Sequence, residues 1–97
     1  MIGYRLLPPA EEEMTEAALF YETARSGFGD IFLDDIQRAI DTIRERPEIG
    51  ANIAYGFRRV LVHRFPFSII YWIEEGEVIV AAVAHQRRHP NYWIKRI

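Results

Sequence analysis

Residues 57–93 read FRRVLVHRFPFSIIYWIEEGEVIVAAVAHQRRHPNYW, and this stretch decides the fold. It contains three apolar runs, which predict strands over 57–64, 67–73 and 77–84. Pro66 marks a tight connection between the first two strands, and Glu75-Gly76 is typical of a hairpin turn between the last two. The last run is almost wholly apolar. It therefore indicates an interior strand covered on both faces, either by this chain or by a partner.

The first half of the chain predicts a short strand followed by two helices. Tyr4 to Leu7 suits a strand, and Pro8-Pro9 ends it and suits the first turn of a helix. Apolar residues continue at helical spacing until the segment 26–29 separates this helix from a second one, which Pro47 ends. The short loop favours an antiparallel helix pair, and residues 48–56 have the character of a connecting loop.

These elements predict an α+β fold with the order β-α-α-β-β-β. We expect a small, mostly antiparallel sheet with an N-terminal helical hairpin packed on one face. Hydrophobic residues make up 49% of the chain, which is typical of a folded globule. No repeat, low-complexity segment or linker divides the sequence, so we expect a single domain over residues 1–97.

Charge is divided unevenly along the chain. Residues 1–55 carry 11 acidic and 5 basic side chains, a net charge of −6, whereas residues 56–97 carry 3 acidic and 7 basic ones, a net charge of +4. All three histidines also lie in the second part. A basic face of this kind suits a polyanion or an acidic protein, and the alternative is a mixed surface without a partner.

Several classes of site are disfavoured by the residues present. The chain has no cysteine, so it has no disulfide and no thiolate metal site. No His-x-x-His spacing, P-loop or Gly-x-Gly-x-x-Gly motif occurs, and we expect neither a metal nor a cofactor. The first residues lack the basic and apolar regions of a signal peptide, and no apolar run is long enough to span a bilayer, so we expect a cytoplasmic protein.

The candidate functional residues occur in two places. After the last predicted strand they are Arg87, Arg88, His89, Tyr92 and Trp93, and on the first strand of residues 57–93 they are Arg58, Arg59, His63 and Arg64. If the two places adjoin, they form a shallow basic cleft, in which arginine and histidine bind phosphate and an aromatic ring stacks on a base. With histidine as a proton carrier, these are sufficient parts for metal-free RNA cleavage by attack of the ribose 2′-hydroxyl on the adjacent phosphate.

Structural roles compete with these functional ones. We expect Trp93 to be a core residue that anchors the C-terminal segment, because tryptophan is mostly buried. Arg58 and Arg64 have a structural alternative too: as solvated charges on an edge strand, they would protect the sheet from aggregation.

Three further residues are candidates for binding. His85 ends an apolar strand, which favours a hydrogen-bonded structural histidine. Tyr71 and Trp72 are consecutive, so they point to opposite faces of the sheet. Only one of them can lie under the helices, and the other remains available to a partner.

The chain resembles the RelE/ParE superfamily of toxins from bacterial type II toxin–antitoxin modules, also called plasmid stabilisation proteins. The ending His-x-x-Arg-x-Pro-x-x-Trp after an apolar strand is the most specific part of the resemblance, which covers nearly the whole chain. The matching residues are Ala17 to Tyr21 with Glu22, Gly29 to Phe32, Pro47, Arg59, Phe65-Pro66-Phe67, Ile70-Tyr71, and His85, Arg88, Pro90 and Trp93.

The resemblance implies a partner and a choice of targets. The partner is a cognate antitoxin whose C-terminal segment wraps the toxin, and operator DNA is contacted through the antitoxin. RelE-like members cleave mRNA in the ribosome with several basic residues and a C-terminal aromatic or histidine, whereas ParE-like members inhibit DNA gyrase and are not nucleases.

The residues of this chain favour the ParE-like activity slightly. Arg59 and Arg87 or Arg88 match basic positions of the nucleases, and Tyr92 matches their aromatic. However, Leu61 and Ser68 stand where nucleases often carry further basic residues. The first alternative is ribosome-dependent mRNA cleavage. The second is a non-toxic member that retains antitoxin binding and promoter control.

Overall fold

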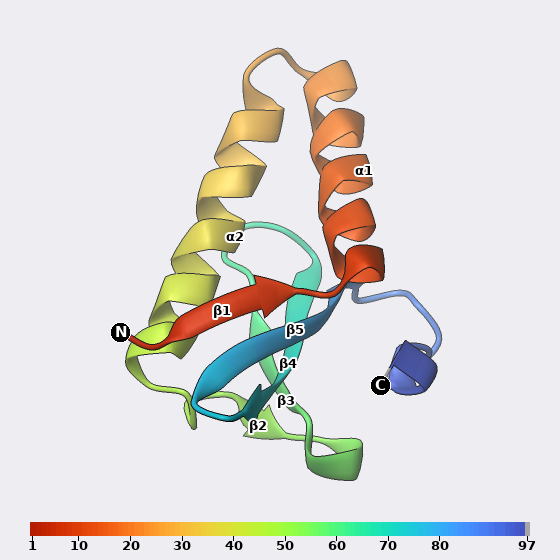
Figure 1. Cartoon of the computed structure of the whole chain (residues 1–97). Coiled ribbons are helices and arrows are strands. Elements are labelled where there is room, and N and C mark those ends of the chain that lie inside the picture. Colours follow the sequence, from red (N-terminus) through yellow and green to blue (C-terminus); the bar gives the residue numbers. More distant parts are fainter. Residues whose placement is uncertain (97) are drawn as a thin grey trace.

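Two helices stand on one face of a five-stranded sheet (Figure 1). The computed structural model describes residues 1–96. In chain order the elements are β1 (Gly3–Leu6), α1 (Pro8–Ala24), α2 (Phe28–Glu45), β2 (Ala51–Asn52), β3 (Arg58–Leu61), β4 (Phe67–Glu74) and β5 (Glu77–His85), with 3-10 turns at Ala54–Gly56 and Ile94–Arg96. The α+β class and the helical hairpin on a small sheet are therefore confirmed.

The helical hairpin depends on a close approach of α1 and α2. A Cβ atom on Gly29 would lie 2.7 Å from the carbonyl oxygen of Ala18, so only glycine lets the helices approach so closely here. Gly27 has a φ of 85°, a left-handed conformation that glycine adopts without strain. The Glu22 carboxylate accepts hydrogen bonds from the backbone N–H groups of both glycines and so closes the turn. Neither helix, within residues 1–96, is long and apolar enough to cross a membrane.

The strand order in the sheet is β1-β5-β4-β3-β2. β1 pairs parallel with β5, and the other pairs are antiparallel. The predicted hairpin turn joins β4 to β5, with positive φ at both Glu75 and Gly76, as a tight two-residue turn requires. Within the β4–β5 ladder the register shifts, so that Tyr71 faces Val80 and Ile70 faces Ala82. The shift leaves Ala81 without an opposite residue in β4, a β-bulge.

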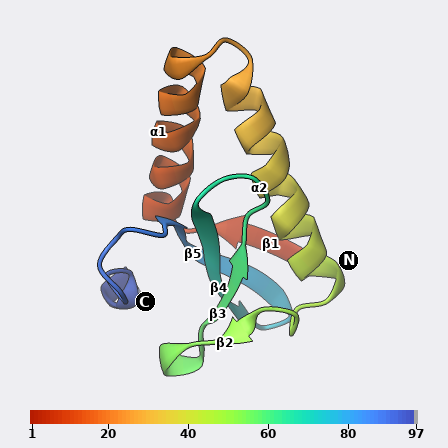
Figure 2. The same ribbon diagram turned by 180° about the vertical axis from the view of Figure 1, so that it is seen from behind.

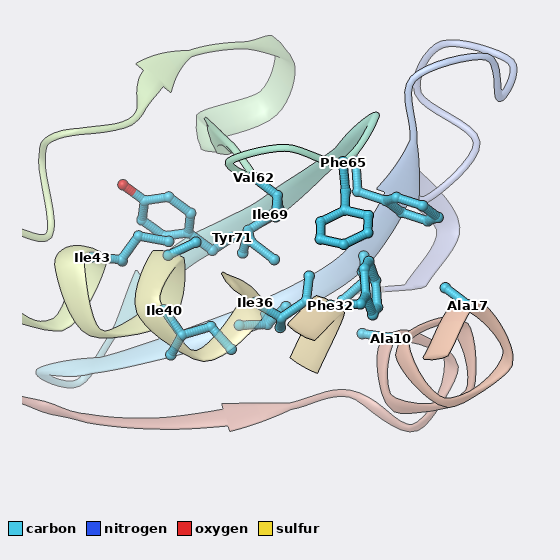
Figure 3. Close-up of a cluster of buried hydrophobic side chains, with 14 of the residues drawn as sticks. Ala10, Ala17, Phe32, Ile36, Ile40, Ile43, Val62, Phe65, Ile69 and Tyr71 are labelled. Carbon is cyan, nitrogen blue, oxygen red and sulfur yellow. The ribbon is translucent and has the colours of Figure 1, made fainter. Parts of the chain in front are cut away.

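Each face of the sheet has its own hydrophobic core. Under the helices, aliphatic and aromatic side chains from α1, α2 and the sheet pack together (Figure 3); among them are Phe32, Ile36, Ile40, Ile69 and Tyr71. On the opposite face, the residues after β5 bring Trp93 onto Phe57, Ile70 and the alanines of β5. β5 is therefore an interior strand covered on both faces by this chain. As predicted, only one of the two consecutive aromatic residues lies under the helices; the structure shows that it is Tyr71, and Trp72 lies on the other face.

Two predictions about the segment before β4 were wrong. The strand expected over 57–64 ends at Leu61, because the chain turns back at once: the Val62 N–H bonds to the Phe67 carbonyl, and Arg64 adopts a φ of 70°. The loop expected over 48–56 contains β2, which pairs with β3 and adds a fifth strand to the expected four. A two-residue strand has no apolar alternation, so periodicity does not reveal it.

Candidate functional site

A basic groove lies on the sheet face opposite the helices, between β3 and the segment that follows β5. We call residues 86–96 the strap, because they run from the end of β5, beside the start of α1, over this face of the sheet (Figures 1 and 2). Arg59 and Leu61 of β3 form one wall of the groove, and strap residues form the other. Arg59, His85, Arg88 and His89 line the groove, and no carboxylate side chain does.

Glu13 of α1 anchors the strap wall. Its carboxylate accepts hydrogen bonds from the Arg96 guanidinium at 2.8 and 3.0 Å and from the hydroxyl of Tyr92. Burial, together with the hydrogen bond to Glu13, raises the pKa of Tyr92 above its ordinary value. The Tyr92 hydroxyl is therefore a committed donor that keeps its proton, not a general base.

Arg88 is held at the rim of the groove and remains half-exposed. Its guanidinium lies 3.9 Å from the centre of the Tyr92 ring, a cation–π contact, and 3.9 Å from the Glu13 carboxylate. Because 54% of the side chain is exposed, Arg88 can still reach a ligand in the groove.

The neighbouring histidines differ in their freedom. His85 accepts a hydrogen bond at Nδ1 from the Arg87 backbone N–H at 3.0 Å and packs against the ring of Phe67. It is thus the hydrogen-bonded structural histidine that its position predicted, although it also lines the groove. His89 is exposed, with Nδ1 3.0 Å from the carbonyl oxygen of Pro90. Of the two, His89 is the more exposed to solvent.

Half of the candidate residues lie in the groove and half do not. The groove contains Arg59, His85, Arg88, His89, Tyr92 and Trp93, of which Trp93 is only 3% exposed and acts as the predicted core anchor. Arg87 is exposed beside the groove, and His63 is exposed beyond the end of β3.

The other candidates make internal contacts. Arg58 donates to the backbone carbonyls of Glu48 and Gly50. The Tyr71 hydroxyl donates to the Pro47 carbonyl at 2.7 Å and accepts from the Gly50 N–H. Trp72 packs its edge against Phe57. These contacts stabilise the end of the sheet that lies away from the groove.

Arg64 forms an ion pair that ties the β3–β4 turn to α2. Its guanidinium donates to both oxygens of Asp35, at 2.9 and 3.0 Å, and Asp35 is buried. The hydrogen bond from Arg64 holds the pKa of Asp35 below its ordinary value. Arg64 is therefore a partly exposed partner of a buried carboxylate, not a freely solvated charge.

Sequence reasoning missed Glu13. It stands in an acidic run at the start of α1, where acidic residues are expected to complement the helix dipole. Its hydrogen-bond partners Val83, Tyr92 and Arg96 are 70 to 83 positions away, so no local pattern identifies them. Among residues 1–96, no three His, Cys, Asp or Glu side chains are grouped so that they could hold a metal ion.

Comparison with known proteins settles the family. The model of the ParE toxin of the type II toxin–antitoxin system parDE matches residues 4–90. The chain belongs to the ParE toxin family. The RelE/ParE resemblance of the sequence is thereby confirmed, and Tyr92 and Arg96 lie beyond the matched residues.

A solved structure shares the fold. The chain is similar to a protein of a chromosomal ParDE toxin–antitoxin system from P. aeruginosa, with a TM-score of 0.64 and 15% sequence identity over 88% of this chain and 96% of that one. A search among curated proteins found no match.

Proposed function

We propose that this ParE-family toxin inhibits DNA gyrase by binding it as a protein ligand. We further propose that it acts in the cytoplasm, that a cognate antitoxin neutralises it, and that operator DNA is contacted only through the antitoxin. The observation that carries the proposal is the chemistry of the basic groove, which suits protein recognition better than phosphate cleavage.

The groove lacks several groups that a nuclease needs. Leu61 and Ser68, which lie opposite each other on β3 and β4, put no charge on the groove where the RelE-like resemblance expects basic residues. Loss of one transition-state donor typically costs about 10²–10³ in rate. The Tyr92 hydroxyl is committed to Glu13, so it is not free to accept a proton.

The same surface has features of a protein-binding site. Leu61 is a large apolar side chain with 62% of its area exposed, and it lines the β3 wall of the groove together with the cationic Arg59. Arginine beside apolar side chains is a combination enriched in protein interfaces. An acidic protein surface would complement Arg59 and Arg88.

A second exposed apolar surface supports the proposed antitoxin. Leu19 and Phe20 of α1 are 62% and 67% exposed, although they are large and apolar. Antitoxin segments that fold on binding would cover such side chains on the helical hairpin. The groove and the hairpin thus offer separate surfaces for target and antitoxin.

One observation favours the ribonuclease alternative, and another disfavours the non-toxic one. Arg59, Arg88 and His89 share the groove, as mRNA cleavage would require. A non-toxic member would have its basic residues tied up in internal ion pairs, for instance with Glu74, Glu75 or Glu77. Glu74 and Glu77 instead pair with Arg5 of β1. In the groove, Arg88 pairs with Glu13 but remains 54% exposed, and among residues 1–96 no ion pair involves Arg59.

Parallel assays with the purified chain test the proposal. We expect inhibition of gyrase supercoiling with accumulation of cleaved DNA, and no codon-positioned cuts by primer extension in a ribosome-dependent translation reaction. The variant Arg88→Ala should weaken gyrase inhibition, while Arg87→Ala, an equal loss of charge outside the groove, should not. Ribosome-dependent mRNA cuts with normal gyrase would reverse the assignment, and inactivity in both assays would favour the non-toxic member.

A further inference from the structure

In its second half, β5 has a strand on only one side, and on the other side its backbone groups bond to side chains. β1 pairs with β5 only as far as Val80, and the N–H of Leu7 makes the last backbone bond on that side. β5 continues to His85. Beyond the bulge at Ala81, its backbone groups on this side face α1 and the strap instead of another strand.

Glu13 and Arg96 satisfy this open edge together. Glu13 accepts a hydrogen bond from the Val83 N–H at 3.1 Å, and Arg96 donates one to the Ala81 carbonyl at 3.0 Å. The two side chains are also bonded to each other, and only 15% of Glu13 and 17% of Arg96 is exposed. One ion pair thus joins α1, β5 and the end of the strap.

The Glu13–Arg96 ion pair also contacts residues that line the groove. Tyr92 donates to Glu13, and its ring lies between two guanidinium groups, 3.9 Å from that of Arg88 and 4.9 Å from that of Arg96. Arg88 therefore owes its place at the rim to Glu13 and Tyr92. Glu13 itself does not line the groove.

Few other contacts hold the strap. Where the strap begins, the Gln86 N–H bonds to the Pro66 carbonyl at 2.8 Å. In the rest of the strap, within the described residues, the backbone makes only short turns, such as the bonds from Tyr92 to His89 and from Arg96 to Trp93. Apart from the burial of Trp93 against Phe57, the Glu13 cluster is its main attachment. Short turns of this kind have little stability alone, so the strap is held closed by the Trp93 anchor and the Glu13 cluster together.

We propose that Glu13 is a positioning residue that latches the strap against β5 and thereby forms the groove wall carrying Arg88. This inference rests on the proposed function, in which the groove contacts the target. When the latch is lost, the strap opens, Arg88 loses its fixed place opposite Arg59, and the target is bound more weakly although the helical hairpin is intact.

The test compares Glu13→Gln with Glu12→Gln, a loss of the same charge from an exposed neighbouring position on α1. Hydrogen exchange of the full chain should show faster exchange at Val83 and throughout the strap in the Glu13 variant only, with α2 unchanged. The concentration needed for half-inhibition of gyrase should rise by about tenfold or more, as expected for a lost charge-assisted hydrogen bond.

A double-mutant cycle separates positioning from general destabilisation. If Glu13 acts by placing Arg88, then Glu13→Gln should have little further effect on inhibition in an Arg88→Gln background. An equal loss in both backgrounds would assign Glu13 a structural role only. Unchanged exchange in the strap would overturn the latch, and an open strap with undiminished inhibition would overturn its link to the groove. If the wild-type chain does not inhibit gyrase, the proposed function fails, while the exchange measurement still decides the latch.

Discussion

Replacement of Trp93 by alanine tests whether the strap is part of the stable fold. Trp93 is 3% exposed and packs its ring 4.5 Å from that of Phe57, in the centre of the core opposite the helices. A buried tryptophan removes about 200 Å² from water, worth about 5 kcal/mol at ~25 cal/mol per Å². Large aromatic-to-alanine changes in cores cost about 3–5 kcal/mol, so we expect a loss in that range.

This loss would consume much of the stability of the chain. Small domains unfold with a free energy of about 5–15 kcal/mol, and 1 kcal/mol shifts the melting temperature of a domain this size by roughly 4–8 °C. The assay is urea unfolding followed by far-ultraviolet circular dichroism, which reports the helices and sheet and not the strap alone. Lowered stability by this probe means that the strap folds cooperatively with the domain.

Trp72→Ala is the matched control. Trp72 lies on the same face and also contacts Phe57, but it is only partly buried, so its loss should cost clearly less. If Trp93→Ala leaves the unfolding free energy within about 0.5 kcal/mol of wild type, as surface changes do, the reasoning is refuted. The strap would then be a separately opening segment whose apolar contacts add nothing to the domain.

Three other predictions follow from single contacts. Arg88→Ala should relieve growth inhibition in cells without lowering the unfolding midpoint, because Arg88 is half-exposed, and undiminished toxicity of this variant would remove the groove rim from the mechanism. The hydrogen bond from Arg64 lowers the pKa of Asp35 in the folded state, so its stabilisation is present above the unfolded pKa and is lost as pH falls through the folded pKa. Unfolding free energies measured at about pH 7 and about pH 2 should therefore differ more in wild type than in Asp35→Asn, and an equal difference would argue against the ion pair. Gly50→Ala would place a Cβ atom 2.6 Å from the Tyr71 hydroxyl oxygen, and we expect a loss of about 1–3 kcal/mol in thermal unfolding. Gly3→Ala is its control, since the nearest atom to that Cβ would be 3.7 Å away, and equal losses in the two variants would contradict the steric argument.

The elements predicted correctly are those with a local cause. Proline and glycine bound both helices, apolar spacing marks the buried side of α2, and the Glu75-Gly76 turn sets the β4–β5 hairpin. β2 was missed because its two residues become a strand only by pairing with β3. β3 was predicted too long because its apolar alternation continues through a turn that hydrogen bonds, not hydrophobicity, define.

For the candidate site, too, local features were predictable from the sequence and long-range contacts were not. The sequence by itself determined the family, the α+β class, the excess of basic over acidic residues after Phe57 and the burial of Trp93. Composition, periodicity and motif spacing are properties of neighbouring residues. Only the tertiary structure decided which basic residues share a groove. In the folded chain Arg64 pairs with Asp35, and Arg88 lies on the groove wall opposite Arg59. Glu13 pairs with Arg96, which is 83 positions away in the sequence. Such contacts depend on the order of strands in the sheet and on the path of the strap, and no spacing along the chain encodes them.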